Sequence, residues 1–264
     1  GRLSSGFIRK LRRRRCMTHT PENRSAEGHS NKVHLTFDID WAPDVSIDAI
    51  RKVINPRGIK ATFFITHPSD IVSDLIADGH EIGVHPNFLP GSSQGDEPEK
   101  IIEYLLNIVP NARALRTHAL VQSSPLFQRI FSSFPQLRYD LSLFMYKFPH
   151  IEPFSWSFGG TEFTRVNYNW EDDAAFFDDG FDWSKPYCPG PVSVYDFHPI
   201  HIHLNSSGSE HYDALKQAIQ VPLTQVSEAE IRQYQNNGNG ARSFLEAMAA
   251  SPNQHIDFEG LLCA

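Results

Sequence analysis

Ionisable side chains recur at the ends of short apolar segments in this chain. Carboxylates and imidazoles are the side chains that hold divalent transition metals, and they are also the usual general acids and bases. One such residue alone is ordinarily a loop residue, but a set that converges would form a metal or acid–base site. The residues concerned are Asp38, Asp40, His67, His85, Arg116, His118 and His198.

These residues follow segments whose pattern predicts strands, and helix-like segments separate them. Strand–helix units in series indicate a parallel sheet with helices outside it, and about seven units favour a barrel. The carboxyl ends of parallel strands share one face, which would bring the ionisable groups together. We predict strands over 33–40, 61–66, 81–85, 112–119, 137–144 and 192–198, and helices over 44–54, 69–77, 98–108, 124–134, 210–220 and 241–250.

The charge of the chain is unevenly distributed along its 264 residues. Seven of the 24 Lys and Arg residues lie in the first fifteen positions, which leaves 17 against 31 Asp and Glu in the remainder. So acidic a body disfavours nucleic-acid binding, and no apolar run reaches the ~18 residues that cross a bilayer. The three dispersed cysteines and the lack of a signal-peptide pattern predict a cytoplasmic location. We expect a disordered basic tail over 1–31, which we favour over an electrostatic tether to membrane or RNA, and a single domain over 32–264.

Five short motifs in a fixed order resemble the polysaccharide deacetylase family, which has the NodB-homology fold. The family's Thr-Phe-Asp-Asp-Gly reads Thr-Phe-Asp-Ile-Asp at 36–40, and Ala-Thr-Phe-Phe is intact at 61–64. Gly-His-Glu-Ile-Gly-x-His is intact at 79–85, Arg116 remains from Arg-x-Pro-x-Gly, and His198 ends the late strand. The strings His-Pro-Asn-Phe, Arg-Thr-His and Trp-Glu-Asp-Asp are similar to the divergent WbmS-like branch. The resemblance implies an α/β fold, a distorted and incomplete (β/α) barrel of about seven parallel strands.

The resemblance implies that Asp40 and His85 ligate a divalent transition metal. Zinc suits a site of one carboxylate and two imidazoles, and cobalt, nickel or iron would also fit. The family's second ligand histidine is replaced here by Leu89, so one ligand is missing. We propose His67 for that position, because strand two would lie between strands one and three, and His118 is the alternative.

The catalytic roles also follow from the resemblance. Asp38 would act as the general base toward water, and His198 would protonate the departing amine. Arg116 would orient the base through a charge-assisted hydrogen bond. The remaining assignments are a carboxylate partner for Arg116, either Asp172 or Asp173, and an oxyanion-binding backbone N–H near His118.

Aromatic and polar residues near the predicted strand ends offer contacts for a sugar. Aromatic faces stack on the apolar C–H surfaces of sugar rings, so we predict Trp41 and Trp170, together with Asn87, as substrate contacts. His80 lies at the opposite end of its strand, and we predict a structural role for it. The alternation of histidine with isoleucine predicts the solvent-facing side of an edge strand at His201 and His203.

We therefore expect a metal-dependent hydrolase that removes an acyl group from an amino sugar in surface-polysaccharide or glycolipid biosynthesis. Its partner would be an N-acylated carbohydrate, and the sequence does not define an oligomeric state. A metal-free glycoside hydrolase is one alternative, using Asp38 with Glu171 or Asp172 at a separation of roughly 5–10 Å. A non-catalytic carbohydrate-binding protein is the other. Chelation of metal would discriminate between the first two, since a glycosidase should not respond to it.

Overall fold

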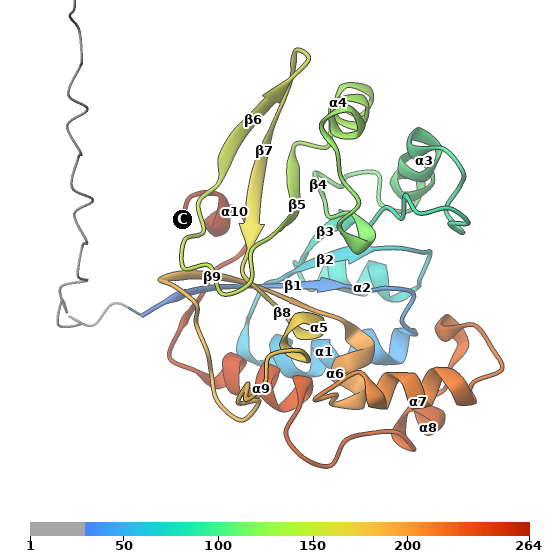
Figure 1. The fold of residues 1–264 in the computed structure, drawn as a ribbon, viewed down its shortest axis with the longest axis vertical. Coiled ribbons are helices and arrows are strands. Elements are labelled where there is room, and N and C mark those ends of the chain that lie inside the picture. Colours follow the sequence, from blue (N-terminus) through green and yellow to red (C-terminus); the bar gives the residue numbers. More distant parts are fainter. Residues whose placement is uncertain (1–29) are drawn as a thin grey trace, which may run out of the picture.

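The computed structural model describes residues 30–264, and the predicted tail over 1–31 lies outside them apart from its last two positions (Figure 1). The strands are β1 Lys32–Asp38, β2 Thr62–Ile65, β3 Glu81–Val84, β4 Ala114–Leu115, β5 Tyr139–Phe144, β6 Phe154–Phe158, β7 Thr161–Tyr168, β8 Trp170–Glu171, β9 Val192–Phe197 and β10 Gln254–His255. The helices are α1 Asp44–Ile54, α2 Ile71–Ala77, α3 Pro98–Ile108, α4 Ser124–Ser133, α5 Asp172–Ala175, α6 Pro199–Leu204, α7 Glu210–Ala218, α8 Glu228–Arg232, α9 Ala241–Ala250 and α10 Phe258–Leu262.

The strands form one mixed sheet in the order β6-β7-β5-β4-β3-β2-β1-β9-β8, with β10 beside the start of β1. Every pairing is parallel except that of β6 with β7, which form a hairpin at one end of the sheet (Figure 1). β6 and β8 end the order without pairing to each other, so the sheet does not close. The predicted α/β fold, an incomplete barrel of mostly parallel strands, is confirmed.

The sheet curves strongly around its polar face. Arg116 directly follows β4, and its Nη1 lies 3.0 Å from Oδ1 of Asp38 on β1, although β3 and β2 intervene. In a flat sheet, strands three positions apart would be separated by about 14 Å. Direct contact between these side chains therefore requires a concave sheet, and it puts the two charged groups inside the curve.

Alternation along β1 separates an apolar face from a polar one. Val33, Leu35 and Phe37 belong to the large core between the sheet and its covering helices, among them α1, α3 and α9. His34 and Asp38 occupy the opposite face and make polar contacts across the concave side. Because successive side chains of a strand point to opposite faces, one seven-residue strand supplies both core and site.

The concave side is closed near the start of β1 by the C-terminal helix α10. Phe258 and Leu261 of this helix pack with Phe64 and Tyr168 in a second apolar cluster. The ring of His34 lies 6.3 Å from that of Phe258, which fixes α10 at the amino end of β1. The carboxyl ends of the strands are left as the face where polar side chains gather. Within the described residues, every helix is too short or too polar to span a bilayer.

The structure differs from the predicted elements in three places that bear on the site or the sheet. The strand predicted over 112–119 is only β4, because the chain turns away after Arg116 through Ala119 and Leu120, which have positive φ. The β6–β7 hairpin was not predicted, although Gly159-Gly160, with φ of 59° and 80°, is a strong turn signal.

The third difference concerns His201 and His203, which we predicted on an edge strand. They lie in helix α6 and are buried there. Pro199 explains the difference, because its fixed φ suits the first turn of a helix. The hydroxyl of Ser46 on α1 hydrogen-bonds Nδ1 of His203 at 2.9 Å, which ties α6 to α1.

Candidate active site

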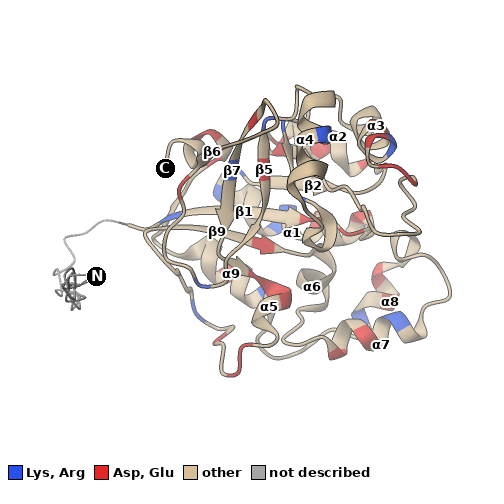
Figure 2. Ribbon diagram, turned by 45° about the horizontal axis from the view of Figure 1, so that its top comes forward, with Lys and Arg blue, Asp and Glu red and all other residues tan. Residues whose placement is uncertain are grey.

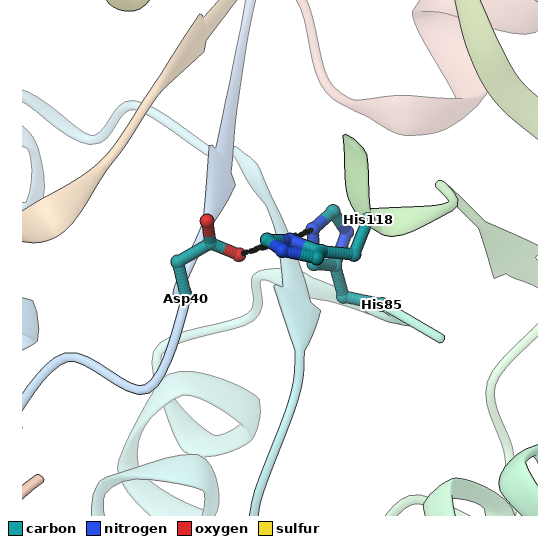
Figure 3. Close-up of side chains that lie close together, drawn as sticks. All are labelled: Asp40, His85 and His118. Atoms are coloured by element: carbon teal, nitrogen blue, oxygen red, sulfur yellow. Dashed lines mark hydrogen bonds and ion pairs between the residues drawn. The ribbon is translucent and has the colours of Figure 1, made fainter. Parts of the chain in front are cut away.

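Asp40, His85 and His118 form a compact triad at the carboxyl ends of the strands (Figure 3). Asp40 follows β1, His85 follows β3, and His118 comes from the short turn after β4. Nε2 of His85 lies 3.1 Å from Oδ1 of Asp40, and Nδ1 of His118 lies 3.2 Å from the same oxygen. The two ring nitrogens are 3.3 Å apart. Three potential ligand atoms thus face one another at nearly equal distances.

The spacing of this triad fits a divalent transition metal. Ligand atoms at bond lengths of about 2.0–2.2 Å, in tetrahedral or octahedral arrangement, are separated by roughly 3.0–3.5 Å. The donor set of one carboxylate oxygen and two imidazole nitrogens is also the kind that zinc accepts. The residues present therefore fit such an ion.

The loops that carry the triad contain residues in the left-handed region. Asp40 and Trp41 have φ of 38° and 54°, and Ala119 and Leu120 have φ of 51° and 52°. Such residues cost of order 1–3 kcal/mol each and persist where surrounding contacts hold them. Here the backbone N–H of Trp41 donates to Oγ1 of Thr66 at 3.1 Å. Backbone strain thus coincides with two of the three triad loops.

His67, which we predicted as the third ligand, is not part of the triad. Its Nδ1 hydrogen-bonds Oγ1 of the preceding Thr66 at 2.9 Å, and the group of ligand atoms around Asp40 does not include it. His118, the alternative, occupies that place instead. The geometry therefore favours His118 over His67, a choice that the sequence could not make because it does not define the direction of a side chain after its strand has ended.

Asp38 lies beside the triad and is paired with Arg116. Arg116 donates from Nη1 to Oδ1 of Asp38 at 3.0 Å and from the same nitrogen to Asp196, while its Nε donates to the carbonyl oxygen of Leu141 at 3.1 Å. Asp38 Oδ2 lies 3.6 Å from Nδ1 of His85. We predicted Asp172 or Asp173 as the partner of Arg116, and both assignments are wrong. Asp196 takes that role because it lies on the concave face of β9.

The guanidinium of Arg116 is held between two aromatic rings. Its Cζ lies 4.6 Å from the ring centre of Phe64 and 4.2 Å from that of Tyr168, both within the range of a cation–π contact. Gly83 on β3 makes room for this arrangement, because a Cβ there would lie 2.6 Å from the Phe64 ring and 2.9 Å from the carbonyl oxygen of Ala114. The glycine of the Gly-His-Glu-Ile-Gly-x-His motif thus has a packing role beneath the site.

His198 faces the triad from the end of β9 and is held by Asp172. Nδ1 of His198 lies 2.7 Å from Oδ1 of Asp172, and the backbone N–H of His198 donates to Oδ2 of the same carboxylate at 2.9 Å. With Nδ1 bound as a donor, Nε2 points toward Oδ2 of Asp40 at 3.7 Å. The ring is therefore fixed with one nitrogen directed at the site.

The two acids of the Asp-x-Asp pair differ in pKa because their surroundings differ. Burial raises the pKa of Asp38 to about 6, and the charge of Arg116 opposes this rise only in part. Burial would also raise the pKa of Asp40, but hydrogen bonds with His118 and His85 hold it well below its ordinary value. Asp38 therefore has the proton affinity of a general base near neutral pH, whereas Asp40 stays ionised as a ligand must.

The pKa of His198 is shifted in the opposite direction from most buried histidines. Burial acts to lower it, but the charges of Asp172 and Asp173 raise the pKa well above its usual value. A protonated imidazole directed at the site is suited to donate a proton.

The comparisons with known proteins identify the family. The sequence matches the family described as WbmS-like polysaccharide deacetylase over residues 35–216, well over half of the chain. The chain belongs to this family. Polysaccharide deacetylases are hydrolases of carbon–nitrogen bonds, so the chain is an enzyme of that class. This assignment favours the deacetylase over the glycosidase and binding-protein alternatives.

Among solved structures, one resembles this deacetylase well in sequence and fold, and others resemble it less. A Bordetella bronchiseptica protein, WbmS, described as a polysaccharide deacetylase involved in O-antigen biosynthesis, is 29% identical with a TM-score of 0.71, over 83% of this chain and 89% of that one. The peptidoglycan N-acetylglucosamine deacetylase Bc1960 is 14% identical with a TM-score of 0.44, over 88% of each chain. A family 4 acetyl xylan esterase from Clostridium thermocellum, in complex with cobalt, is 15% identical with a TM-score of 0.36, over 64% of this chain and 74% of that one. No curated protein sequence matches significantly.

The three predicted substrate contacts of the deacetylase differ in burial and in whether they border the triad. Trp41 is half-buried, with its ring edge-on to His118 at 5.3 Å, so it borders the triad. Asn87 is also half-buried, but its Oδ1 accepts the N–H of Leu89 at 3.0 Å and thereby stabilises its own loop. Trp170 is fully buried among aromatic rings that include Phe244 at 4.7 Å, so it is a core residue and presents no face to a sugar.

Two polar residues of the site were missed in the sequence. Asp196 lies two positions before His198, and on a strand that spacing places both on one face, which was a usable signal. Gln94 is buried and clamps two loops, because its Nε2 donates to the carbonyl oxygens of Thr66 and His85 at 2.9 and 3.1 Å. Nothing in the loop sequence around Gln94 indicates this role. His80 is structural as predicted, since its Nδ1 accepts the N–H of Ala61 at the amino ends of β2 and β3, away from the triad.

Proposed function

We propose that this WbmS-like deacetylase is a metal-dependent de-N-acylase that acts on an N-acylated amino sugar in surface-polysaccharide or glycolipid biosynthesis. The observation that carries the proposal is the triad of Asp40, His85 and His118, whose ligand atoms are spaced as around a metal ion. A candidate base, Asp38, and a candidate acid, His198, lie beside it. The substrate class is supported by the 29% identity to the Bordetella protein described as acting in O-antigen biosynthesis.

Asp40, His85 and His118 would hold the ion, for which zinc is our first choice. When bound, such an ion supplies a water of lowered pKa and polarises the carbonyl of the scissile amide. Asp38 accepts the proton of the attacking water, since its carboxylate is buried beside the triad and its pKa is about 6. Arg116 fixes the orientation of that carboxylate through the 3.0 Å hydrogen bond.

His198 completes the reaction as a general acid. Water adds to the carbonyl carbon, the C–N bond breaks, and Nε2 of His198 gives its proton to the departing amine, which leaves the acyl group as a carboxylate. Asp172 keeps Nδ1 of His198 occupied and so keeps Nε2 directed at the site.

The backbone after β4 would contribute to oxyanion stabilisation, although not at the N–H groups of Thr117 or His118. Thr117 N–H donates to Oγ of Ser142 and His118 N–H to the carbonyl oxygen of Pro86. The N–H of Ala119 makes no hydrogen bond to the described residues, so it is the available donor in this turn.

Reconstitution with metal tests this proposal. The protein is stripped with a chelator, and release of acetate and of free amine is followed on a panel of N-acetylated amino sugars, free, lipid-linked and polymeric. We expect no turnover by the stripped protein and recovery of turnover with one zinc or cobalt ion per chain. Turnover that is insensitive to chelation would overturn the metal dependence, and cleavage of glycosidic bonds instead of amides would overturn the reaction.

A further inference from the structure

A second cluster of ligand-type side chains adjoins the proposed site. Asp173 lies on α5, His198 at the end of β9, and His201 on α6. Each of the three offers an atom that lies within 4.8 Å of the others, and Nε2 of His201 is 2.9 Å from Oδ1 of Asp173. The acidic residues of α5 stand out beside α6 in Figure 2.

His198 is arranged in this cluster as metal-binding histidines generally are. A ligating imidazole usually donates one N–H to a carboxylate, which directs the other nitrogen at the ion. Asp172 holds Nδ1 of His198 in that manner at 2.7 Å. Nε2 of His198 also lies 3.7 Å from Oδ2 of Asp40, so the second cluster is in contact with the first triad.

The negative charge around the two clusters is enough to favour more than one bound cation. Asp38 and Asp196 share Arg116, while Asp40, Asp172 and Asp173 contact only histidines among the cationic side chains described. Three neighbouring carboxylates that lack an arginine or lysine partner favour divalent cations, and of these Asp172 is buried, Asp40 is partly buried and Asp173 is about half exposed.

We propose that Asp173, His198 and His201 form a second divalent-metal site, which zinc fills after the triad of Asp40, His85 and His118. Asp173 makes this the weaker site, because its side chain is 49% exposed and water competes there for the ion, whereas no side chain of the triad is more than 24% exposed. Zinc on Nε2 of His198 takes the place of the proton that this residue would donate, so excess zinc inhibits. That last consequence rests on the proposed function, whereas the binding of the second ion does not.

Zinc titration of the whole chain tests the second site. The metal-stripped protein is titrated with zinc against a chromophoric chelator, and the number of bound ions is counted by native mass spectrometry. We expect two ions in the wild type, the second bound at least about tenfold more weakly than the first. His201→Gln and Asp173→Asn should each retain only the tight ion. Asp173→Asn is the variant that should leave the fold intact, since the side chain of Asp173 is 49% exposed.

Two further variants serve as controls. His203→Gln changes another buried histidine of α6 that is outside the cluster, and it should still bind two ions. Asp40→Ala should lose the tight ion and retain the weak one. Saturation of the wild type at one ion, or two ions in both His201→Gln and Asp173→Asn, would overturn the proposal.

Inhibition is read as the ratio of turnover at excess zinc to turnover at one zinc per chain, within each variant. We expect this ratio to fall at least about fivefold in the wild type as the second site fills and to stay near one in Asp173→Asn. A wild type that binds two ions but turns over no amide would contradict the proposed function while supporting the second site.

Discussion

Arg116 donates to Asp38 across the concave face of the sheet, over a separation of 78 residues in sequence. Both side chains are buried, and the guanidinium of Arg116 lies over the rings of Phe64 and Tyr168. A buried carboxylate next to a guanidinium has a fixed orientation and few waters around it. This relationship would hold Asp38, the base that we propose, in place beside the triad before any substrate binds.

The identity of the third ligand can be tested by two histidine substitutions. We expect His118→Ala to weaken zinc binding by about 100-fold or more, since it removes an atom of the triad. His67→Ala is the matched control, because His67 also follows a strand at this edge but lies outside the triad. Competition with a zinc-binding dye measures both affinities. Loss of affinity in His67→Ala with none in His118→Ala would restore our original prediction.

The orientation of His198 depends on Asp172, which accepts both its ring and its backbone N–H. We expect Asp172→Asn to reduce kcat by about 10³–10⁴-fold, because an amide can hold the ring in the wrong tautomer and cannot stabilise the imidazolium. The measurement is steady-state deacetylation with one zinc per chain, and the zinc content of the variant should equal that of the wild type. Near-normal kcat in Asp172→Asn would mean that His198 is not the acid.

Gly83 is predicted to be intolerant of a methyl group. A Cβ there would meet the Phe64 ring and the Ala114 carbonyl oxygen at under 3 Å, so we expect Gly83→Ala to lower the free energy of unfolding by about 1–3 kcal/mol. Urea denaturation measures this difference. Gly238→Ala is the control, because its Cβ would approach only the flexible side chain of Asn236. Equal stability of the two variants would show that the sheet relaxes around the added atom.

His34 should make the stability of the fold depend on pH. Burial lowers its pKa to about 4, and its ring is held neutral between the Ile256 carbonyl oxygen and the Thr62 hydroxyl. The unfolded chain takes up this proton near pH 6.5, so it carries more protons than the folded chain between pH 6.5 and 4. The stabilisation by neutral His34 is therefore complete above pH 6.5 and is lost as the pH falls toward 4, by up to roughly 3 kcal/mol.

The pH effect is isolated by comparing the wild type with His34→Gln in urea at several pH values. The difference in unfolding free energy between the two proteins should shrink as the pH falls from 6.5 to 4. A constant difference between the wild type and His34→Gln would contradict the assignment to this residue.

The sequence was most informative where local patterns are strong. Helix α1 has the bounds we predicted, because apolar residues recur along one face and Pro56 and Gly58 follow its end. The convergence of Asp40, His85 and His198 followed from the rule that parallel strands end on one face.

The rest depended on contacts that no local pattern encodes. The pairing of Arg116 with Asp196 spans 80 residues and arises from the curvature of the sheet. The choice of His118 over His67 depends on the turn with positive φ after β4 and on the hydroxyl of Thr66. Trp170 was predicted as a sugar contact because sequence does not distinguish a buried ring from an exposed one.

Asp38→Asn tests whether Asp38 is the base of a metal-dependent deacetylation. Zinc content and acetate release are measured on the same preparation of the variant and of the wild type. We predict one tightly bound zinc per chain in both proteins and a loss of at least about 10³-fold in kcat in Asp38→Asn. Undiminished acetate release by Asp38→Asn at equal zinc content would show that Asp38 is not the base.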